Sequence, residues 1–265
     1  MEPLNAARSQ EAIPLPENQE PSTHFGFLTV PEDDKVRWVR RHFNTVACKY
    51  DFMNTLLSFG AHYIWKRIAV RMMDLREGDR IIDVCGGTAD LALMAAPLIG
   101  PSGRVFLYDI NWAMMKTGIP KVAATPYAQQ IHYIQGDAEK ISFDDASFDA
   151  AMVGFGIRNL THMEEGFKEM YRVLKPGGKL MCLEFSEPVT PWFRFLYDFY
   201  SFYIMPAVGK VLGGSRHAYT YLPESIRMFP GAQRLKEILE EIGFEKVSYR
   251  RLTDGIAVVH VGRKG

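Results

Sequence analysis

A short apolar run ends in a glycine turn that has an acid at its base. Residues 80–84 are typical of a β-strand, Gly86, Gly87 and Thr88 form the turn, and Asp83 precedes it. A strand that ends this way exposes backbone N–H groups at the carboxyl edge of an α/β sheet, where such folds bind ligands. The turn matches neither the dinucleotide Gly-x-Gly-x-x-Gly pattern nor a Gly-Lys-Ser/Thr phosphate loop. We therefore expect a nucleoside site with Asp83 beneath it.

Acids or glycines also follow the next three predicted strands. Asp109 ends strand 104–109, Asp137 and Ala138 follow strand 131–135, and Gly154 lies near the end of strand 148–155. A lone aspartate is usually a turn former or a helix cap, but these positions share the carboxyl edge of one sheet. We expect Asp109 to accept hydrogen bonds from both ribose hydroxyls, and Asp137-Ala138 to contact the edge of the adenine ring.

The glycine turn has no lysine or arginine to bind phosphate. Its side chains are those of Cys85, Thr88, Ala89 and Asp90. They suit a nucleoside ligand that carries no phosphate, and S-adenosylmethionine is such a ligand.

The composition excludes several classes of function. The 265 residues contain 31 basic and 31 acidic side chains, so no overall field attracts nucleic acid or anionic lipid. The three cysteines form no C-x-x-C pair and the histidines show no metal spacing, so we expect neither a disulfide framework nor a metal site. A reducing cytosol fits best. No stretch of 18 uncharged apolar residues is present, and none is expected to span a bilayer.

The strands alternate with helical segments, which predicts an α/β fold with a mostly parallel sheet. Residues 1–23 have the composition of a disordered tail, acidic and without an apolar core, unlike a signal or transit peptide. Residues 24–265 are expected to form one domain, with a helical cap at 24–74. Residues 186–230 interrupt the alternation with an aromatic-rich stretch, which predicts a helical insert on the substrate side or a packed structural insert. Asp254-Gly255 between two β-rich runs predicts a terminal antiparallel hairpin.

Four segments resemble, in order, the signatures of the ubiquinone/menaquinone biosynthesis C-methyltransferases, which are class I S-adenosylmethionine-dependent enzymes. They are His24-Phe-Gly-Phe-Leu-Thr-Val30, Tyr50-Asp-Phe-Met-Asn54, Phe155-Gly-Ile-Arg-Asn159 and the ten residues from Tyr221 to Pro230. The resemblance covers nearly everything after residue 23. It implies a Rossmann-like fold with a seven-stranded, mostly parallel sheet, a C-terminal antiparallel hairpin, N-terminal helices and the aromatic insert.

The same resemblance implies cofactor contacts at Thr88, Asp109, Asp137 and Ala138. Two positions depart from the family pattern: Gly154 stands where serine is frequent, and Ala89 where glycine is usual. Because alanine does not easily adopt a positive φ, we expect either a helical residue 89 or an altered turn, and an effect on cofactor affinity.

The resemblance also implies methylation of a ring carbon of a polyprenylated quinol, demethylmenaquinol or the equivalent ubiquinone precursor. A hydroquinone carbon becomes nucleophilic when a neighbouring hydroxyl loses its proton. We expect Arg158 to stabilise the oxyanion, Asn159 to orient it and Tyr50 to hydrogen-bond a substrate hydroxyl. No histidine is expected to be the base. Two alternatives remain open: another aromatic or lipid acceptor, and a non-catalytic scaffold with a cofactor fold.

The polyprenyl tail would bring the protein into transient contact with the inner face of a membrane. The acidic, non-targeting N-terminal segment favours a bacterial cytoplasmic protein. The oligomeric state is not predicted.

Overall fold

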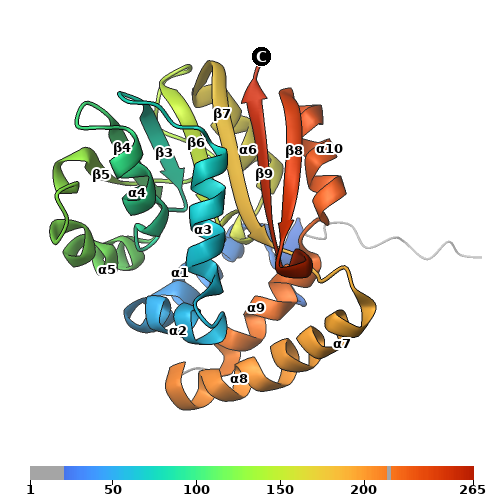
Figure 1. Cartoon of the computed structure of the whole chain (residues 1–265). Helices are drawn as coiled ribbons and strands as arrows, with labels where there is room; N and C mark the ends of the chain where they lie inside the picture. Colours follow the sequence, from blue (N-terminus) through green and yellow to red (C-terminus); the bar gives the residue numbers. More distant parts are fainter. Residues whose placement is uncertain (1–20, 214–215) are drawn as a thin grey trace, which may run out of the picture.

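The computed structural model describes residues 21–213 and 216–265, and its centre is a seven-stranded sheet (Figure 1). The strand order is β5-β4-β3-β6-β7-β9-β8. Strands β3 to β7 are parallel, while β9 runs antiparallel to both neighbours, β7 and β8. The bounds are β3 Arg80–Val84, β4 Arg104–Asp109, β5 Ile131–Gln135, β6 Phe148–Gly154, β7 Leu174–Phe185, β8 Phe244–Leu252 and β9 Ala257–Lys264. The predicted fold class and its terminal hairpin are confirmed.

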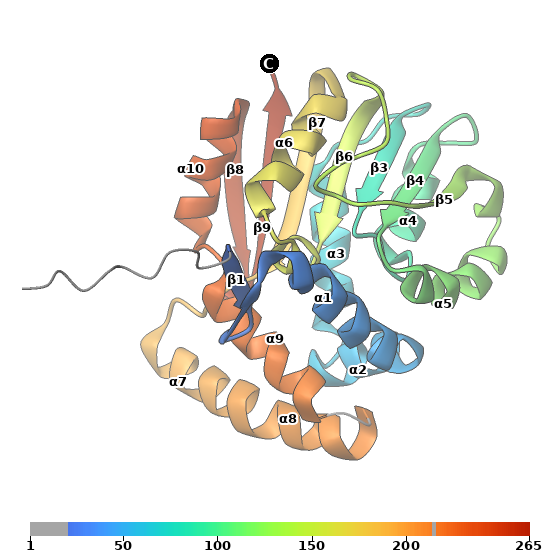
Figure 2. The same ribbon diagram turned by 180° about the vertical axis from the view of Figure 1, so that it is seen from behind.

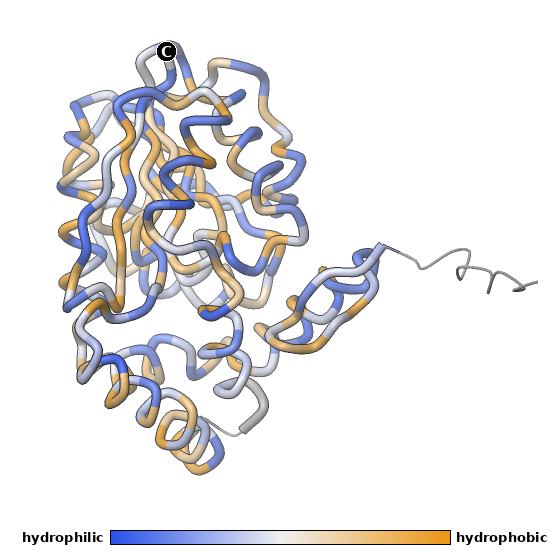
Figure 3. Tube along the Cα trace, turned by 90° about the vertical axis from the view of Figure 1, so that its right-hand side faces the viewer, coloured by the Kyte–Doolittle hydropathy of each residue, from blue (hydrophilic) through white to orange (hydrophobic). Residues whose placement is uncertain are grey.

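Helices cover both faces of this sheet, as Figures 1 and 2 show from opposite sides. Successive strand residues point to opposite faces, so Ile81 packs under the helices of one face and Ile82 under those of the other. Both side chains are fully buried. The helices are α3 Ala61–Met72, α4 Asp90–Ala95 and α5 Trp112–Ala123 on the first face, and α6 Met163–Val173 and α10 Ala232–Ile242 on the second. Figure 3 shows apolar residues concentrated in the strands.

The N-terminal segment contains a hairpin that the sequence did not predict. Strands β1 Ser22–Phe25 and β2 Leu28–Pro31 pair antiparallel, so β1 begins inside the segment for which we expected a tail. Residues 1–20 of that tail lie outside the described residues. The helices α1 Glu32–Val46 and α2 Tyr50–Leu57 follow and lie at the carboxyl edge of the parallel strands, whereas α3 packs against the sheet (Figure 1).

The aromatic stretch forms a helical layer beneath the same edge of the sheet (Figure 2). It consists of α7 Pro191–Phe199, the π-helical turn η5 Tyr200–Ile204, α8 Met205–Val208, a second π-helical turn η6 Gly209–Gly213, and α9 Arg216–Met228. Within the described residues, no helix is both long and apolar enough to cross a bilayer.

Candidate active site

A cavity of about 90 Å³ lies at the carboxyl ends of β3 to β6. Gly87, Asp109, Asp137, Ala138 and Gly154 all line it, so the structure brings together one predicted residue or pair from each strand end. The 3₁₀ turn η4 Ile157–Asn159 contributes Asn159 to the same wall.

Asp109 is held in place by the turn it faces. Its Oδ2 accepts a hydrogen bond from the Gly87 N–H at 2.9 Å, and its Oδ1 accepts one from the Asn111 N–H at 2.7 Å. Burial raises the pKa of Asp109 to about 6, although the two backbone hydrogen bonds oppose the shift. Near neutral pH the group is therefore ionised and can accept hydrogen bonds from a ribose.

In the glycine turn, Ala89 adopts the left-handed backbone conformation that glycine would adopt more easily. Ala89 has φ 70° and ψ 19° and directly precedes α4. The expectation of a helical residue 89 is wrong, because Ala89 carries the positive φ itself, at a cost of about 1–2 kcal/mol. The expected effect on cofactor affinity stays a prediction. At Gly86 an added Cβ would lie 2.7 Å from Cγ of Leu107 and 3.0 Å from the Asp83 carbonyl oxygen, so only glycine fits there.

A packing contact accounts for Gly154. A Cβ at this position would lie 2.6 Å from Cδ1 of Leu91. Leu91 is buried at the start of α4. A serine at position 154 would require Leu91 to move, because the leucine side chain occupies the space of the serine side chain.

Three other predicted cofactor residues, Asp83, Gly86 and Thr88, are absent from the lining of both described cavities. Asp83 is fully buried beneath the turn, where its Oδ2 accepts the Ala92 N–H at 3.1 Å and its Oδ1 has no hydrogen-bond partner. Burial raises its pKa to about 8. The Thr88 hydroxyl donates to Oδ1 of Asp51 at 2.6 Å. These residues shape and tether the turn.

The lining of the 90 Å³ cavity fits S-adenosylmethionine. Asp109 offers carboxylate oxygens to a ribose, while Val36, Met114 and Ala138 offer apolar surface to a base. Oδ1 of Asp83, which has no hydrogen-bond partner, lies buried under the turn. Arg40 is the cationic side chain in this lining and it comes from α1, so the turn itself has no phosphate clamp.

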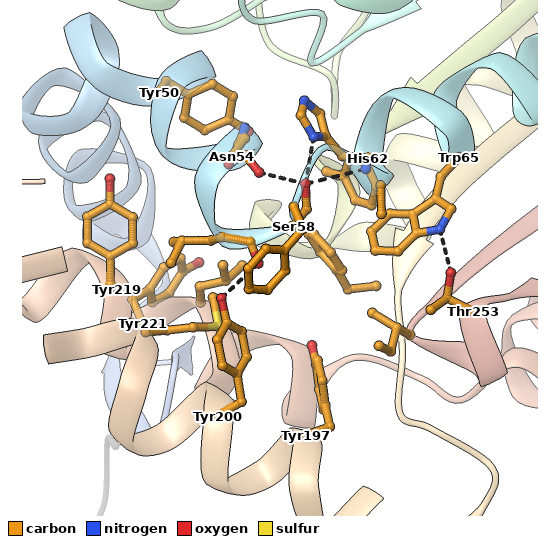
Figure 4. A pocket seen from close by; sticks show the side chains of 18 of the residues that line it. Tyr50, Asn54, Ser58, His62, Trp65, Tyr197, Tyr200, Tyr219, Tyr221 and Thr253 are labelled. Carbon is orange, nitrogen blue, oxygen red and sulfur yellow. Dashed lines mark hydrogen bonds between the residues drawn. The ribbon is translucent and has the colours of Figure 1, made fainter. Parts of the chain in front are cut away.

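A second cavity of about 440 Å³ adjoins the first (Figure 4). Phe43, Tyr50 and Phe155 line both. The wall is rich in aromatic side chains, which come from α1 to α3, the strand ends and the insert. Trp65 lies on one side, with its Nε1 donating to the Thr253 hydroxyl at 2.9 Å. Tyr197, Tyr200, Tyr219 and Tyr221 come from the insert.

Arg158 lines this larger cavity and forms a buried ion pair. Its Nη1 donates to Oε1 of Glu184 and to the Phe155 carbonyl, both at 2.6 Å, and its Nε donates to the Ser225 hydroxyl at 3.3 Å. The side chains of Arg158 and Glu184 are 5% and 2% exposed. Burial acts to lower the pKa of Arg158, but the Glu184 carboxylate outweighs it and leaves that pKa above its ordinary value. The guanidinium therefore stays charged.

The four resembling segments meet around this arginine. Tyr221 donates to Oδ1 of Asn159 at 2.8 Å, and its ring stacks on Phe25 of β1 with centroids 4.1 Å apart. Oε2 of Glu224 accepts the Phe27 N–H at 3.2 Å, so α9 holds the N-terminal hairpin. The motif at 50–54 contributes the Tyr50 ring to the facing wall.

A polar chain runs behind the wall between the two cavities. Lys66 pairs with Asp90 at 2.6 Å, Lys121 pairs with Asp90 at 2.5 Å and with Asp51 at 2.9 Å, and Asp51 accepts from Thr88. The chain ties α2, α3, α4 and α5 to the glycine turn.

Sequence reasoning assigned no role to Glu184, the buried partner of Arg158, or to His62 of the larger cavity. Glu184 lies near the end of an apolar strand, as Asp109 does, and that signal could have identified it. His62 lines the cavity and forms a 2.7 Å hydrogen bond through Nδ1 to the Ser58 hydroxyl, while its buried Nε2 has no partner. Burial, together with Lys66, lowers the pKa of His62 to about 4, so the imidazole is neutral and a weak base.

Solved structures with the same fold include methyltransferases. A SAM-dependent methyltransferase from Aquifex aeolicus is 16% identical, with a TM-score of 0.54 over 76% of this chain and 89% of its own. A protein from Thermotoga maritima, titled a SAM-dependent methyltransferase and possible histamine N-methyltransferase, is 19% identical, with a TM-score of 0.59 over 85% of this chain and 99% of its own. At these identities the likeness shows the fold alone.

Sequence comparisons are more specific. The ubiquinone/menaquinone biosynthesis C-methyltransferase UbiE of Pseudomonas fluorescens is 46% identical over 92% of this chain and 96% of its own length. The protein of the same name from Ectopseudomonas mendocina is 45% identical over 94% and 97%. The model of the ubiE/COQ5 methyltransferase family matches residues 29–264. The chain therefore belongs to the ubiE/COQ5 methyltransferase family, and S-adenosylmethionine is its cofactor.

Proposed function

We propose that the protein transfers a methyl group from S-adenosylmethionine to a ring carbon of a polyprenylated hydroquinone. The acceptor is demethylmenaquinol or the equivalent ubiquinone precursor, as the names of its relatives suggest. The observation that carries the proposal is a pair of adjoining cavities that share Phe43, Tyr50 and Phe155. One lies at the strand ends and is lined by Asp109 and Asp137; the other is rich in aromatic residues and has a volume of about 440 Å³.

When bound, the cofactor supplies an electrophilic methyl group. The protein holds the acceptor ring beside the smaller cavity and excludes water from it. Tyr50 lies at the boundary, and no described residue hydrogen-bonds its hydroxyl. We assign this hydroxyl to a hydrogen bond with the substrate.

Arg158 is assigned to the oxyanion. Its Nη1 and Nε are engaged within the protein, whereas no described residue accepts a hydrogen bond from Nη2. A cation fixed in this way favours the ionised quinol hydroxyl, since it binds the phenolate more strongly than the phenol. It cannot itself be the base, because the guanidinium stays protonated.

Asn159 acts through the turn that carries Arg158. Its Nδ2 donates to the Gly156 carbonyl at 3.1 Å and its Oδ1 accepts from Tyr221. Both ends of the amide are used, so the side chain orients the η4 turn, and through it the guanidinium.

The test uses demethylmenaquinol and its benzoquinol counterpart with methyl-labelled cofactor, and locates the label by mass spectrometry and NMR. Label on a ring carbon of either quinol supports the proposal. Label only in another aromatic or lipid acceptor would favour the first alternative, and no cofactor binding in calorimetry would favour a scaffold.

Arg158→Lys tests the assigned role without leaving Glu184 unpaired. Loss of the planar fork should lower kcat about 10²-fold and leave cofactor affinity unchanged. Arg172→Lys is the matched control, because Arg172 forms an arginine–carboxylate pair with Glu169 away from both cavities. Equal loss of turnover and cofactor binding in Arg158→Lys would contradict the assignment.

A further inference from the structure

We propose that the outer side of the insert docks on the surface of an anionic lipid bilayer, so that the larger cavity opens toward the lipid. The proposal rests on the proposed function, because a polyprenyl tail resides in a bilayer. We call this surface the aromatic face; it consists of Trp192, Phe195, Leu196, Phe199, Tyr203 and Val211.

The aromatic face is apolar and exposed along its length. The exposed fractions are 67% for Trp192, 73% for Phe195, 69% for Tyr203 and 79% for Val211. From Trp192 to Tyr203 its members recur at spacings of three and four residues, which places them on one side of a helix. Helices that lie in the interface of a bilayer present such a side, with aromatic anchors.

The opposite side of α7 is part of the larger cavity. Phe193 and Tyr197 point to it, and Leu196 belongs to both sides, since it lines the cavity and is 51% exposed. Across the opening, Phe59 in the turn between α2 and α3 also lines the cavity and is 85% exposed. Its ring centroid is 6.2 Å from that of Tyr200. Exposed apolar side chains therefore lie on both sides of the entrance. A polyprenyl tail that passes between them would move from the lipid into the cavity without contact with water.

The charges near the aromatic face suit an anionic surface. Between residues 187 and 213 the acids are Glu187 and Asp198, and both are paired: Glu187 with Arg194 and Arg227, and Asp198 with Arg227. Lys210 is exposed and forms no described ion pair. Arg194 and Arg227 offset the two acids, which leaves the positive charge of Lys210 in surplus. One such residue near an anionic surface contributes about 1 kcal/mol to contact with acidic headgroups.

A second copy of the chain on this surface would cover the cavity entrance, whereas a bilayer would deliver the substrate to it. We therefore assign the aromatic face to a bilayer and not to a second copy of the chain. It also predicts that the aromatic face matters for substrates embedded in lipid and not for soluble ones.

The experiment compares the full chain with Phe195→Ser/Phe199→Ser in sedimentation with vesicles of phosphatidylglycerol and phosphatidylcholine. Neither phenylalanine lines a described cavity. Leu28→Ser/Leu98→Ser is the matched control, because those leucines are 50% and 46% exposed elsewhere. We expect the wild type and the control to bind, and the phenylalanine variant to bind about tenfold more weakly, since two fewer aromatic rings enter the interface.

A parallel assay separates this proposal from the proposed function. The phenylalanine variant should methylate a short-tailed, soluble quinol at the wild-type rate and a vesicle-embedded quinol more slowly. Failure to methylate the soluble quinol in the wild type would refute the function alone. Equal vesicle binding by variant and wild type, or no binding by the wild type, would overturn the docking surface. A concentration-dependent dimer abolished by the same variant would assign the surface to a second copy.

Discussion

Replacing Asp51 by asparagine should loosen the helix that carries Tyr50 from the cofactor turn. Asp51 lies in the first turn of α2, and its two oxygens bind partners on different elements: the Thr88 hydroxyl at 2.6 Å and Nζ of Lys121 at 2.9 Å. Asparagine keeps the shape and one acceptor oxygen but removes the charge. The change therefore tests whether this carboxylate couples the two cavities.

The expected destabilisation follows from the two contacts. A hydrogen bond to a charged group contributes about 1.5–3 kcal/mol, and a neutral acceptor keeps roughly half of that. The side chains of Lys121 and Asp51 are 32% and 31% exposed, so solvent screens their ion pair and its loss costs about 0.5–1 kcal/mol. The sum is about 1.5–2.5 kcal/mol. For a domain of this size that corresponds to a fall in Tm of about 3–10 °C.

The measurement is a double-mutant cycle with Thr88→Val, in which the stability of each variant is determined by thermal and urea unfolding. If the Thr88–Asp51 hydrogen bond forms, the two changes should be non-additive by about 1 kcal/mol. Calorimetry should show weaker cofactor binding in Asp51→Asn, because the glycine turn loses its tether. Asp33→Asn, an exposed acid on α1, is the control. Additivity within about 0.3 kcal/mol, with unchanged cofactor affinity, would refute the coupling.

Two further predictions concern pH. Burial raises the pKa of Asp109 to about 6, and the ionised carboxylate is the form that accepts hydrogen bonds from a ribose. Cofactor affinity measured by calorimetry should therefore fall as the pH drops through 6. An affinity that stays constant between pH 5 and 7 would contradict the assignment of Asp109 to the ribose. Burial raises the pKa of Asp83 from its ordinary value of 3.8 to about 8. The folded state thus holds a proton that the unfolded state has lost, and this group's contribution to stability is present below pH 3.8 and disappears as the pH rises through 8. Asp83→Asn should therefore gain Tm relative to the wild type between pH 6 and 8, and a constant difference would show that Asp83 is already ionised.

The strands of the sheet could be predicted from the sequence because their signals are local. Strands β3, β4 and β5 have the predicted bounds, since each is a short run rich in apolar residues between polar residues or glycines. The β1–β2 hairpin could not be predicted in this way. Its two four-residue strands are largely exposed, and what holds them is a distant partner: Glu224 of α9 accepts the Phe27 N–H, and a Cβ at Gly26 would collide with that carboxylate.

The candidate site shows the same division between local and long-range information. The strand-end positions Asp109, Asp137 and Gly154 could be placed together because parallel strands share one edge. The pairing of Arg158 with Glu184 depends on β7 lying beside β6, and no spacing in the sequence reports it. The neutral state of His62 likewise depends on burial that only the folded chain produces.

Three of the four segments that carry the resemblance have no sheet to position them. The hairpin, α2 and α9 all lie outside the sheet, so backbone ladders to it do not fix where they sit. Side-chain contacts must do so: Phe25 stacks on Tyr221, Tyr221 binds Asn159, and Ser225 binds Arg158. A change in any one of these alters the position of the guanidinium through the others. The aromatic side chains of α7 are different, because the ring contacts described for the outer ones are with neighbours along the same helical layer: Trp192 with Phe193, and Phe199 with Tyr203. Their exposure is therefore not required by the packing of the domain, which is why the bilayer experiment, and not a stability measurement, tests what they do.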